Sequence, residues 1–179
     1  MAFGYDTDMA LRAAAALANS EHAAPDGLST VQDLADFVLA WGWTGTVLGT
    51  PAELRQVRDI RAQVRSLWAP DEHAAVERVN VLLDQANAVP QLVKHDEYDW
   101  HLHATPSDAP LATRMVVEAA MAVVDVIRDR EFDRLRVCAA DDCDNVLIDL
   151  TRNRSRRFCD AGCGNRLNVA AFRARQAGS

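Results

Sequence analysis

Four cysteines lie in the last quarter of this 179-residue chain, and their spacing constrains the fold more than any other feature. Four residues separate the first pair and three separate the second, with fifteen residues between the pairs. Zinc takes four thiolates at the corners of a tetrahedron, and two short-spaced pairs on separate turns supply them without strain. A segment of about 40 residues is too short to be stabilised by its own core, so a structural metal would explain its folding. The spacing therefore predicts one structural Zn²⁺ bound by Cys138, Cys143, Cys159 and Cys163.

Other uses of four cysteines fit this pattern less well. Buried free thiols usually lie among apolar neighbours, whereas Cys143 lies in DDCDN and Cys163 in AGCGN. Disulfides are rare in the reducing compartment that we expect for this chain, and iron–sulfur clusters use other cysteine spacings. A catalytic zinc ion keeps one position open for water, whereas four thiolates fill the coordination shell.

Charge is distributed unevenly along the chain, whose formal net charge is −7. Residues 1–134 carry 11 Lys and Arg against 21 Asp and Glu, which gives −10, whereas residues 135–179 carry 8 against 5, which gives +3. This asymmetry suggests a basic tail that meets an anion while the acidic body keeps the protein in solution. A solvated tail without a partner is the alternative explanation of the same charges.

Helical periodicity dominates the first 130 residues. A change to alternating apolar and polar residues within 91–105 predicts a short β-hairpin that turns near HDEY. The clearest helix start has Thr50 as N-cap, Pro51 at the first helical position and Glu53 closing a capping box. We expect helices at 7–20, 30–41, 50–68, 71–88 and, buried centrally, at 110–130.

A second unit begins near residue 134, where the apolar periodicity ends. Residues 138–143 read as a turn between two thiols, residues 145–151 and 156–159 are strand-like around the polar turn RNRS, and residues 164–176 have helical spacing. A knuckle, a hairpin and a helix in this order are typical of a treble-clef-like finger. The expected fold class is mainly α (α+β): a helical sensing or interaction domain at 1–133 with a short β-hairpin, folding independently of a small zinc finger at 134–179.

The helical body carries no catalytic signature. The sequence has no nucleophile elbow, phosphate-binding loop or metalloprotease helix, so we expect no enzyme activity. His101 and His103 share a strand face that we expect to be exposed. The four tryptophans are expected in the core: Trp41, Trp43, Trp68 and Trp100. A small-molecule ligand or a protein partner, including a second copy of the chain, is the alternative role for this domain.

Two features bear on where the protein acts. No apolar run reaches the 18 or more residues that a membrane helix needs. The N-terminal segment MAFGYDTDMALR carries acids and lacks the basic-then-apolar order of a secretory signal. We therefore expect a cytoplasmic protein without a membrane partner.

The segment RNRSRRFCDAGCGNR resembles the CGNR zinc finger, which is named for the four residues that here are Cys163, Gly164, Asn165 and Arg166. The preceding pair of cysteines and the segment TRNRSRRFC match the pattern of that family, with Phe158 at the position of its aromatic residue. The body is similar to the accompanying ABATE domain in length, helix order and the position of the finger. The resemblance implies a bacterial, stress-induced transcription regulator whose finger binds DNA.

The arginines of the tail are the candidate DNA contacts. An extended backbone would project Arg152, Arg154 and Arg156 from one face and Arg157 from the other, and Arg173 follows Arg166 by seven residues on the expected helix. Guanidinium groups match phosphate oxygens in a bidentate manner. We predict phosphate contacts through Arg152, Arg154, Arg156, Arg157, Arg173 and Arg175.

We assign Arg166 and Asn165 to structural support of the metal site rather than to phosphate contacts. Asn165 is expected to cap the local backbone. Zinc with four thiolates has a formal charge of about −2, and nearby arginines stabilise it by neutralising the charge or donating to sulfur. The same charge weakens the basic character of the tail. A zinc-stabilised protein-interaction module without nucleic-acid binding is therefore the main alternative, and zinc-thiolate redox or metal sensing is a third.

Overall fold

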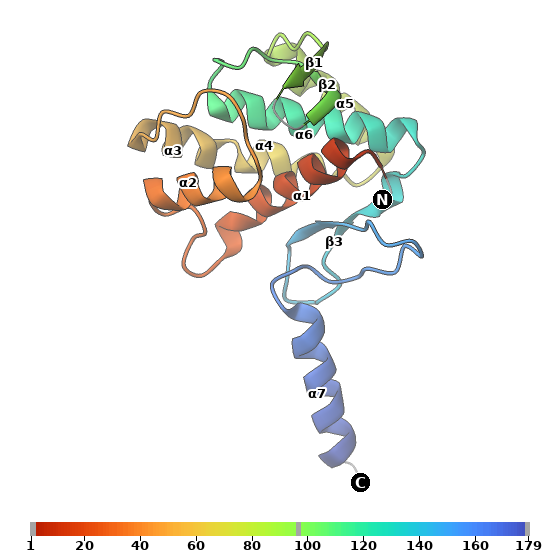
Figure 1. Ribbon diagram of the computed structural model, residues 1–179. Coiled ribbons are helices and arrows are strands. Elements are labelled where there is room, and N and C mark those ends of the chain that lie inside the picture. The colour runs from red at the N-terminus through yellow and green to blue at the C-terminus, as the bar shows by residue number, and fades with distance from the viewer. Residues whose placement is uncertain (1–2, 96–97, 178–179) are drawn as a thin grey trace.

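The computed structural model describes residues 3–95 and 98–177, which form a helical body and a smaller unit that ends in a projecting helix (Figure 1). The body consists of α1 (Tyr5–Asn19), η1 (Ser20–His22), α2 (Val31–Ala40), α3 (Pro51–Asp59), α4 (Arg61–Arg65), α5 (Glu72–Gln85), β1 (Gln91–His95), β2 (Tyr98–His103) and α6 (Leu111–Arg128). The smaller unit consists of η2 (Phe132–Arg134), β3 (Leu135–Val137), β4 (Val146–Ile148) and α7 (Cys163–Ala177). The expected mainly helical α+β class is confirmed.

α6 is the central helix of the body, as its apolar sequence predicts. It contacts α1, α3, α4 and α5, and eleven of its 18 residues are buried. Leu111, Met115 and Val123 on this helix are among the largest fully buried side chains of the protein. Within the described residues, no helix combines the length and the apolar character that crossing a membrane requires.

The helix expected at 50–68 is interrupted. α3 ends at Asp59 and α4 begins at Arg61, so the apolar stripe is carried by two short helices. Thr50 caps α3 as predicted, because its side chain accepts a hydrogen bond from the Glu53 N–H at 3.2 Å. The predicted capping box is wrong: the Glu53 carboxylate instead accepts hydrogen bonds from the N–H groups of Leu48 and Gly49, at 2.9 and 2.8 Å. Glu53 therefore anchors the loop before the helix.

The hairpin of β1 and β2 forms where the alternation predicts it, with Leu92 opposite Leu102 in an antiparallel register. The residues at its expected turn, 96–97, lie outside the described part of the chain. The expectation for its faces is wrong. His101 and His103 are on the half-buried face, whereas Trp100 is 66% exposed and Leu102 49% exposed. The inward face is polar because it borders cavities rather than the apolar core.

The second hairpin pairs β3 with β4, with Arg136 opposite Leu147. The predicted partner, residues 156–159, is not a strand, and it contributes one main-chain hydrogen bond, from the Ala139 N–H to the Arg157 carbonyl at 2.8 Å. The cause is Asp149, whose buried carboxylate accepts hydrogen bonds from the main-chain N–H groups of Thr151 and Arg156, both at 2.9 Å. These bonds fold residues 149–156 into a turn, so β4 ends early and the cysteine knuckle lies within the hairpin.

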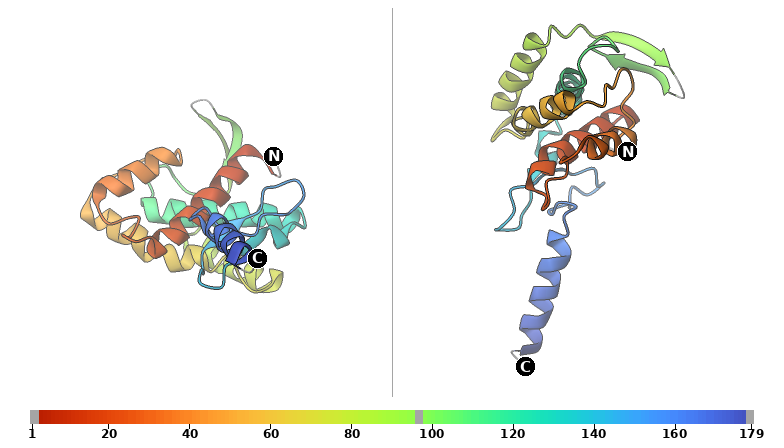
Figure 2. Two further views of the ribbon diagram at one scale, coloured as in Figure 1. Left: turned by 90° about the horizontal axis from the view of Figure 1, so that it is seen from below. Right: turned by 90° about the vertical axis from the view of Figure 1, so that its left-hand side faces the viewer.

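β4 joins the two units. Val146 and Ile148 belong to the hydrophobic core of the body, whereas Leu147 between them packs with the cysteines. The side-chain amide of Asn19, at the end of α1, bonds both the carbonyl and the N–H of Val146, each at 2.8 Å. The indole N–H of Trp68 donates to the Leu147 carbonyl at 2.8 Å. Body and finger are thus one packed structure at this strand, and only α7 stands away from it (Figure 2).

Candidate metal centre

The four cysteine sulfurs converge at one point. All four Sγ atoms lie within 4.8 Å of one another, and the described residues contain no other such group of three or more possible metal ligands. The Sγ of Cys159 is 3.7 Å from that of Cys143 and 3.7 Å from that of Cys163. Zinc–sulfur bonds of about 2.3 Å in a tetrahedron place neighbouring sulfurs about 3.8 Å apart. The geometry therefore fits one tetrahedral zinc ion with no open position.

Local structure brings the two pairs together. Cys138 follows β3 directly, and its N–H donates to the Asn145 carbonyl at 2.8 Å, which closes the knuckle between the strands. Cys163 begins α7, and the preceding Gly162 has a φ of 83°, a left-handed conformation that favours glycine. A hairpin turn and a helix start thus present two ligands each, as in treble-clef fingers.

The burial of the sulfurs makes their thiolate forms unfavourable unless a cation is bound. Burial raises the pKa of the Cys143 thiol to about 12 and also raises the pKa of Cys159. Burial opposes the thiolate of Cys138 too, but N–H groups of Cys159 and Ala140 donate to its sulfur and lower its pKa. Zn²⁺, when bound, supplies the positive charge that stabilises the buried cysteines in their deprotonated, thiolate form.

Polar side chains around the cluster hold its parts in place. Arg166 donates to both carboxylate oxygens of Asp142, at 2.5 and 2.7 Å, and to the Sγ of Cys163 at 3.6 Å. This pairing keeps the pKa of Asp142 below its usual range. Because Asp142 lies in the knuckle and Arg166 on α7, the pair links the two halves of the site. Asn145, which the sequence did not single out, donates to the Sγ of Cys159 at 3.5 Å.

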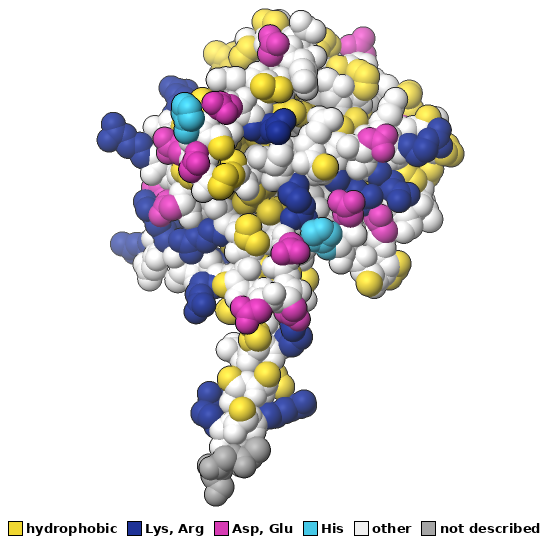
Figure 3. All heavy atoms as spheres, turned by 180° about the vertical axis from the view of Figure 1, so that it is seen from behind, with side chains coloured by type: hydrophobic (Ala, Val, Ile, Leu, Met, Phe, Trp, Pro, Cys, Tyr) yellow, Lys and Arg dark blue, Asp and Glu magenta, His cyan; other side chains and the backbone are white. Residues whose placement is uncertain are grey.

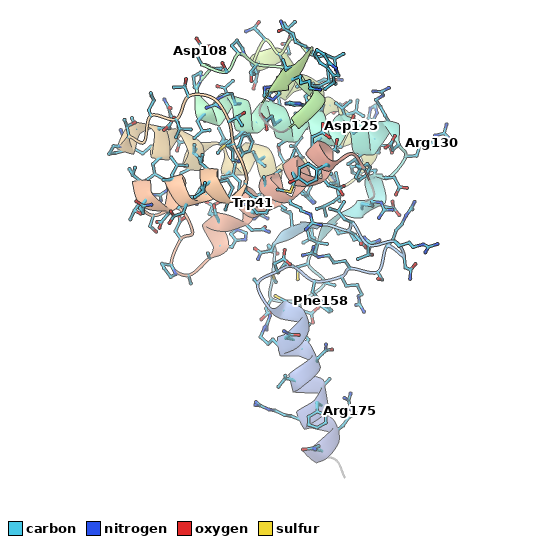
Figure 4. All side chains as sticks on the ribbon, viewed as in Figure 1. Trp41, Asp108, Asp125, Arg130, Phe158 and Arg175 are labelled. Atoms are coloured by element: carbon cyan, nitrogen blue, oxygen red, sulfur yellow. The ribbon has the colours of Figure 1, made fainter. Side chains whose placement is uncertain are left out.

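Gly164 and Asn165, which lie between Cys163 and Arg166, differ in the contacts that they make. A Cβ atom on Gly164 would lie 3.2 Å from the ring of Phe158, so the glycine lets this ring pack on the first turn of α7 (Figure 4). Asn165 is exposed and its side chain forms no hydrogen bond with any described residue. The structure thus gives Asn165 no contact through which it could support the metal site.

Two family models match this chain. The CGNR zinc finger model matches residues 134–176, and the ABATE model, described as "Putative stress-induced transcription regulator", matches residues 11–130. The chain belongs to the ABATE family and carries a C-terminal CGNR zinc finger. A comparison with curated protein sequences gave no match. With the four sulfurs in place, this ABATE protein has one structural zinc site formed by Cys138, Cys143, Cys159 and Cys163.

The arginine-rich loop of the finger is not the extended strand that the alternation suggested. Arg154 has a φ of 50° and forms ion pairs with Glu131 and Asp133, at 2.8 and 2.9 Å. Arg156 pairs with Asp160 at 2.5 Å. Because the turn set by Asp149 reverses the chain here, the three alternating arginines do not form a common row. Arg154 and Arg156 instead form ion pairs with acidic side chains of the protein itself.

The remaining arginines are exposed. Arg157 lies over the Phe158 ring, 5.6 Å from its centroid. Arg152 and Arg173 are exposed and form no side-chain hydrogen bond or ion pair with a described residue. Arg173 and Arg175 lie on the last part of α7, beyond the metal site. α7 is a continuous helix from Cys163, so Arg166 and Arg173 lie on it seven residues apart, as expected.

Two asparagines test whether the polar contacts support metal binding. Asn145→Ala removes a hydrogen bond to a zinc-bound sulfur, and loss of such an outer contact lowers metal affinity by about 10–100-fold. Asn165→Ala removes the same side chain at an exposed position near another ligand and should leave the affinity unchanged. Competition with a chromogenic zinc chelator measures both variants. Equal affinities for Asn145→Ala and the parent protein would show that the contact with Cys159 does not support the site.

Proposed function

We propose that this protein regulates transcription by binding double-stranded DNA through its finger, with α7 as the main contact element. The observation that carries the proposal is the position of α7, which projects from the rest of the protein and presents basic side chains near its end (Figure 3). The body carries a net charge of −10 and repels phosphate. A DNA duplex would therefore approach the far end of α7 rather than the body.

The contact residues follow from the ion pairs within the finger. Arg136, Arg154, Arg156 and Arg166 are engaged with acids of the protein. We therefore assign the phosphate contacts to three exposed arginines outside this group, Arg152, Arg157 and Arg173, and add Arg175 because of its position near the end of α7. The 15 residues of α7 span about 22 Å, and an α-helix is narrow enough to enter the major groove. We propose no catalytic activity for the protein, and we propose that it acts on DNA in the cytoplasm.

A protein partner for the same helix is the second candidate function. Val169 is 48% exposed and Phe172 54% exposed on α7, although both are apolar. An amphipathic helix with such anchors is also suited to a groove on another protein. In that case the finger would be a zinc-stabilised interaction module, and its arginines would serve solubility or the rim of the interface.

Salt dependence distinguishes the two functions. If Arg173 contacts a phosphate, Arg173→Ala should weaken binding similarly across DNA sequences and reduce the slope of log affinity against log salt by about one unit. We expect the same result for Arg152→Ala. Arg55→Ala, on the exposed surface of α3, is the matched control and should leave both values unchanged. Fluorescence anisotropy with random and genomic duplexes, using zinc-loaded protein, measures these quantities.

The experiment has a clear contrary outcome. Absence of binding at low salt, where phosphate attraction is strongest, would exclude the DNA contact. Unchanged binding in both arginine variants would place the contact elsewhere on the protein. Loss of partner capture in Phe172→Ala, without DNA binding in the parent, would favour the protein-interaction module.

A further inference from the structure

A cavity in the helical body lies between α1, the residues that follow α2, β2 and α6. Its volume is about 250 Å³, and Trp41 at the end of α2 forms part of its wall (Figure 4). Drug-sized ligands occupy pockets of about 300–1,000 Å³, so this cavity suits a smaller molecule. Neither the zinc finger nor the proposed DNA contact uses it.

The described lining of the cavity includes carboxyl groups but no Lys or Arg. Asp6 and Glu118 line it, together with His101 and His103. Glu118 forms no hydrogen bond or ion pair with a described residue. Burial raises the pKa of Glu118 to about 7, and the charge of Arg114 lowers it only in part.

Arg114 does not neutralise Glu118 directly. Its guanidinium donates hydrogen bonds to the carbonyls of Thr44, Thr46 and Ala109 and forms no hydrogen bond with Glu118. Glu118 is half-buried and forms no ion pair with a described residue, so its charged form is only partly compensated by the nearby charge of Arg114. A partly desolvated carboxylate without a direct ion-pair partner is costly, and a positively charged ligand would reduce this cost.

Aromatic side chains form the other walls. Tyr5, Trp41 and Trp43 line the cavity, and the Nε1–H of Trp43 is buried with no hydrogen-bond partner among the described residues. The faces of tryptophan and tyrosine rings attract cations. We propose that this cavity binds a small protonated amine, whose ammonium group pairs with Glu118 and Asp6 and whose carbon skeleton contacts Trp41, Trp43 and Tyr5.

A metal ion fits the same residues less well. The Nε2 atoms of His101 and His103 are 3.0 Å apart, close enough to share a metal. However, among the described residues only the four cysteines bring three or more ligand atoms within coordinating reach. A protonated amine needs hydrogen-bond acceptors and aromatic faces but no preassembled coordination shell, so the organic cation is the better match.

The test compares a charged ligand with its neutral isostere. Phenethylamine and 2-phenylethanol differ in the ammonium group, and both are titrated into the full-length zinc-loaded protein at pH 8 by isothermal titration calorimetry. We expect phenethylamine to bind with one-to-one stoichiometry and at least tenfold more tightly than the alcohol. Glu118→Gln preserves the side-chain volume and should weaken amine binding at least tenfold without weakening that of the alcohol.

Two controls keep the result interpretable. Glu72→Gln alters an exposed carboxylate on α5 and should bind the amine as the parent does. Thermal unfolding of Glu118→Gln shows that the variant is folded. Equal binding of amine and alcohol, or no binding of either at millimolar concentration, would overturn the proposal. So would a second equivalent of Ni²⁺ that is lost in His103→Ala, because this would identify a metal site instead. DNA binding by the finger is measured separately and does not depend on this outcome.

Discussion

Replacing Cys159 with serine is expected to abolish stoichiometric zinc binding and to unfold the finger. Cys159 is the best test position because its sulfur lies 3.7 Å from two other ligands and accepts the hydrogen bond of Asn145. Structural zinc contributes an apparent free energy of about 10–16 kcal/mol in isolated finger peptides, far more than a packed core of this size can supply. Most of the stability of residues 138–163 therefore depends on the metal.

The loss should also reach the helical body. Val146 and Ile148 of β4 are buried in the body core, and fully burying one such side chain contributes about 1.5–3 kcal/mol. We expect Cys159→Ser to lower the unfolding midpoint of the whole chain, measured by circular dichroism, with zinc content from elemental analysis. Asn153→Ala, at an exposed position in the same loop, is the control. One full equivalent of zinc and an unchanged midpoint in Cys159→Ser would contradict the assigned ligand set.

Truncation after Asp133 is expected to leave a body that no longer unfolds cooperatively. The cut removes Val146 and Ile148 from the core and leaves the amide of Asn19 and the indole of Trp68 without their partners. Each of these lost hydrogen bonds costs about 0.5–1.5 kcal/mol once water replaces the partner. Together with the lost burial of Val146 and Ile148, about 1.5–3 kcal/mol for each side chain, this approaches the total stability of an ordinary domain, about 5–15 kcal/mol.

A longer fragment provides the matched comparison. Residues 1–150 keep β3 and β4 but lack two zinc ligands, so they separate the packing of the strand from the binding of the metal. We expect the longer fragment to unfold at a higher urea concentration than residues 1–133, with a steeper transition. Equal midpoints and slopes for residues 1–133 and the full chain would restore the independent domain boundary that the sequence suggested.

Local patterns made the metal ligands and most helices predictable. Cysteine spacing reports the ligand set because each pair must close a short loop, and this requirement is met within a few residues of chain. Thr50 caps α3 for an equally local reason. The same capping signal did not reveal that the Glu53 carboxylate turns back to Leu48 and Gly49, because that choice depends on the path of the preceding loop.

Features that depend on distant residues could not be predicted in the same way. Alternation in β2 defines two faces, but the position of the cavity decides that His101 faces inward and Trp100 outward. The strand partner of β4 was missed because one buried carboxylate, Asp149, turns the following loop. Arg154 looks like a DNA contact in sequence, yet its charge is opposed by Glu131 and Asp133 from before β3.

The paired hydrogen bonds between Asn19 and Val146 limit how such a protein can be recombined. The side-chain amide of Asn19 bonds the N–H and the carbonyl of Val146, which are the main-chain groups that a neighbouring strand would otherwise bond. The two residues are 127 positions apart in the sequence. A chimaera that joins this finger to a body without an amide at that position would leave both main-chain groups of Val146 unpaired. Transfer of this finger to another body would therefore require the end of α1 as well, because the two distant segments form one hydrogen-bonded unit.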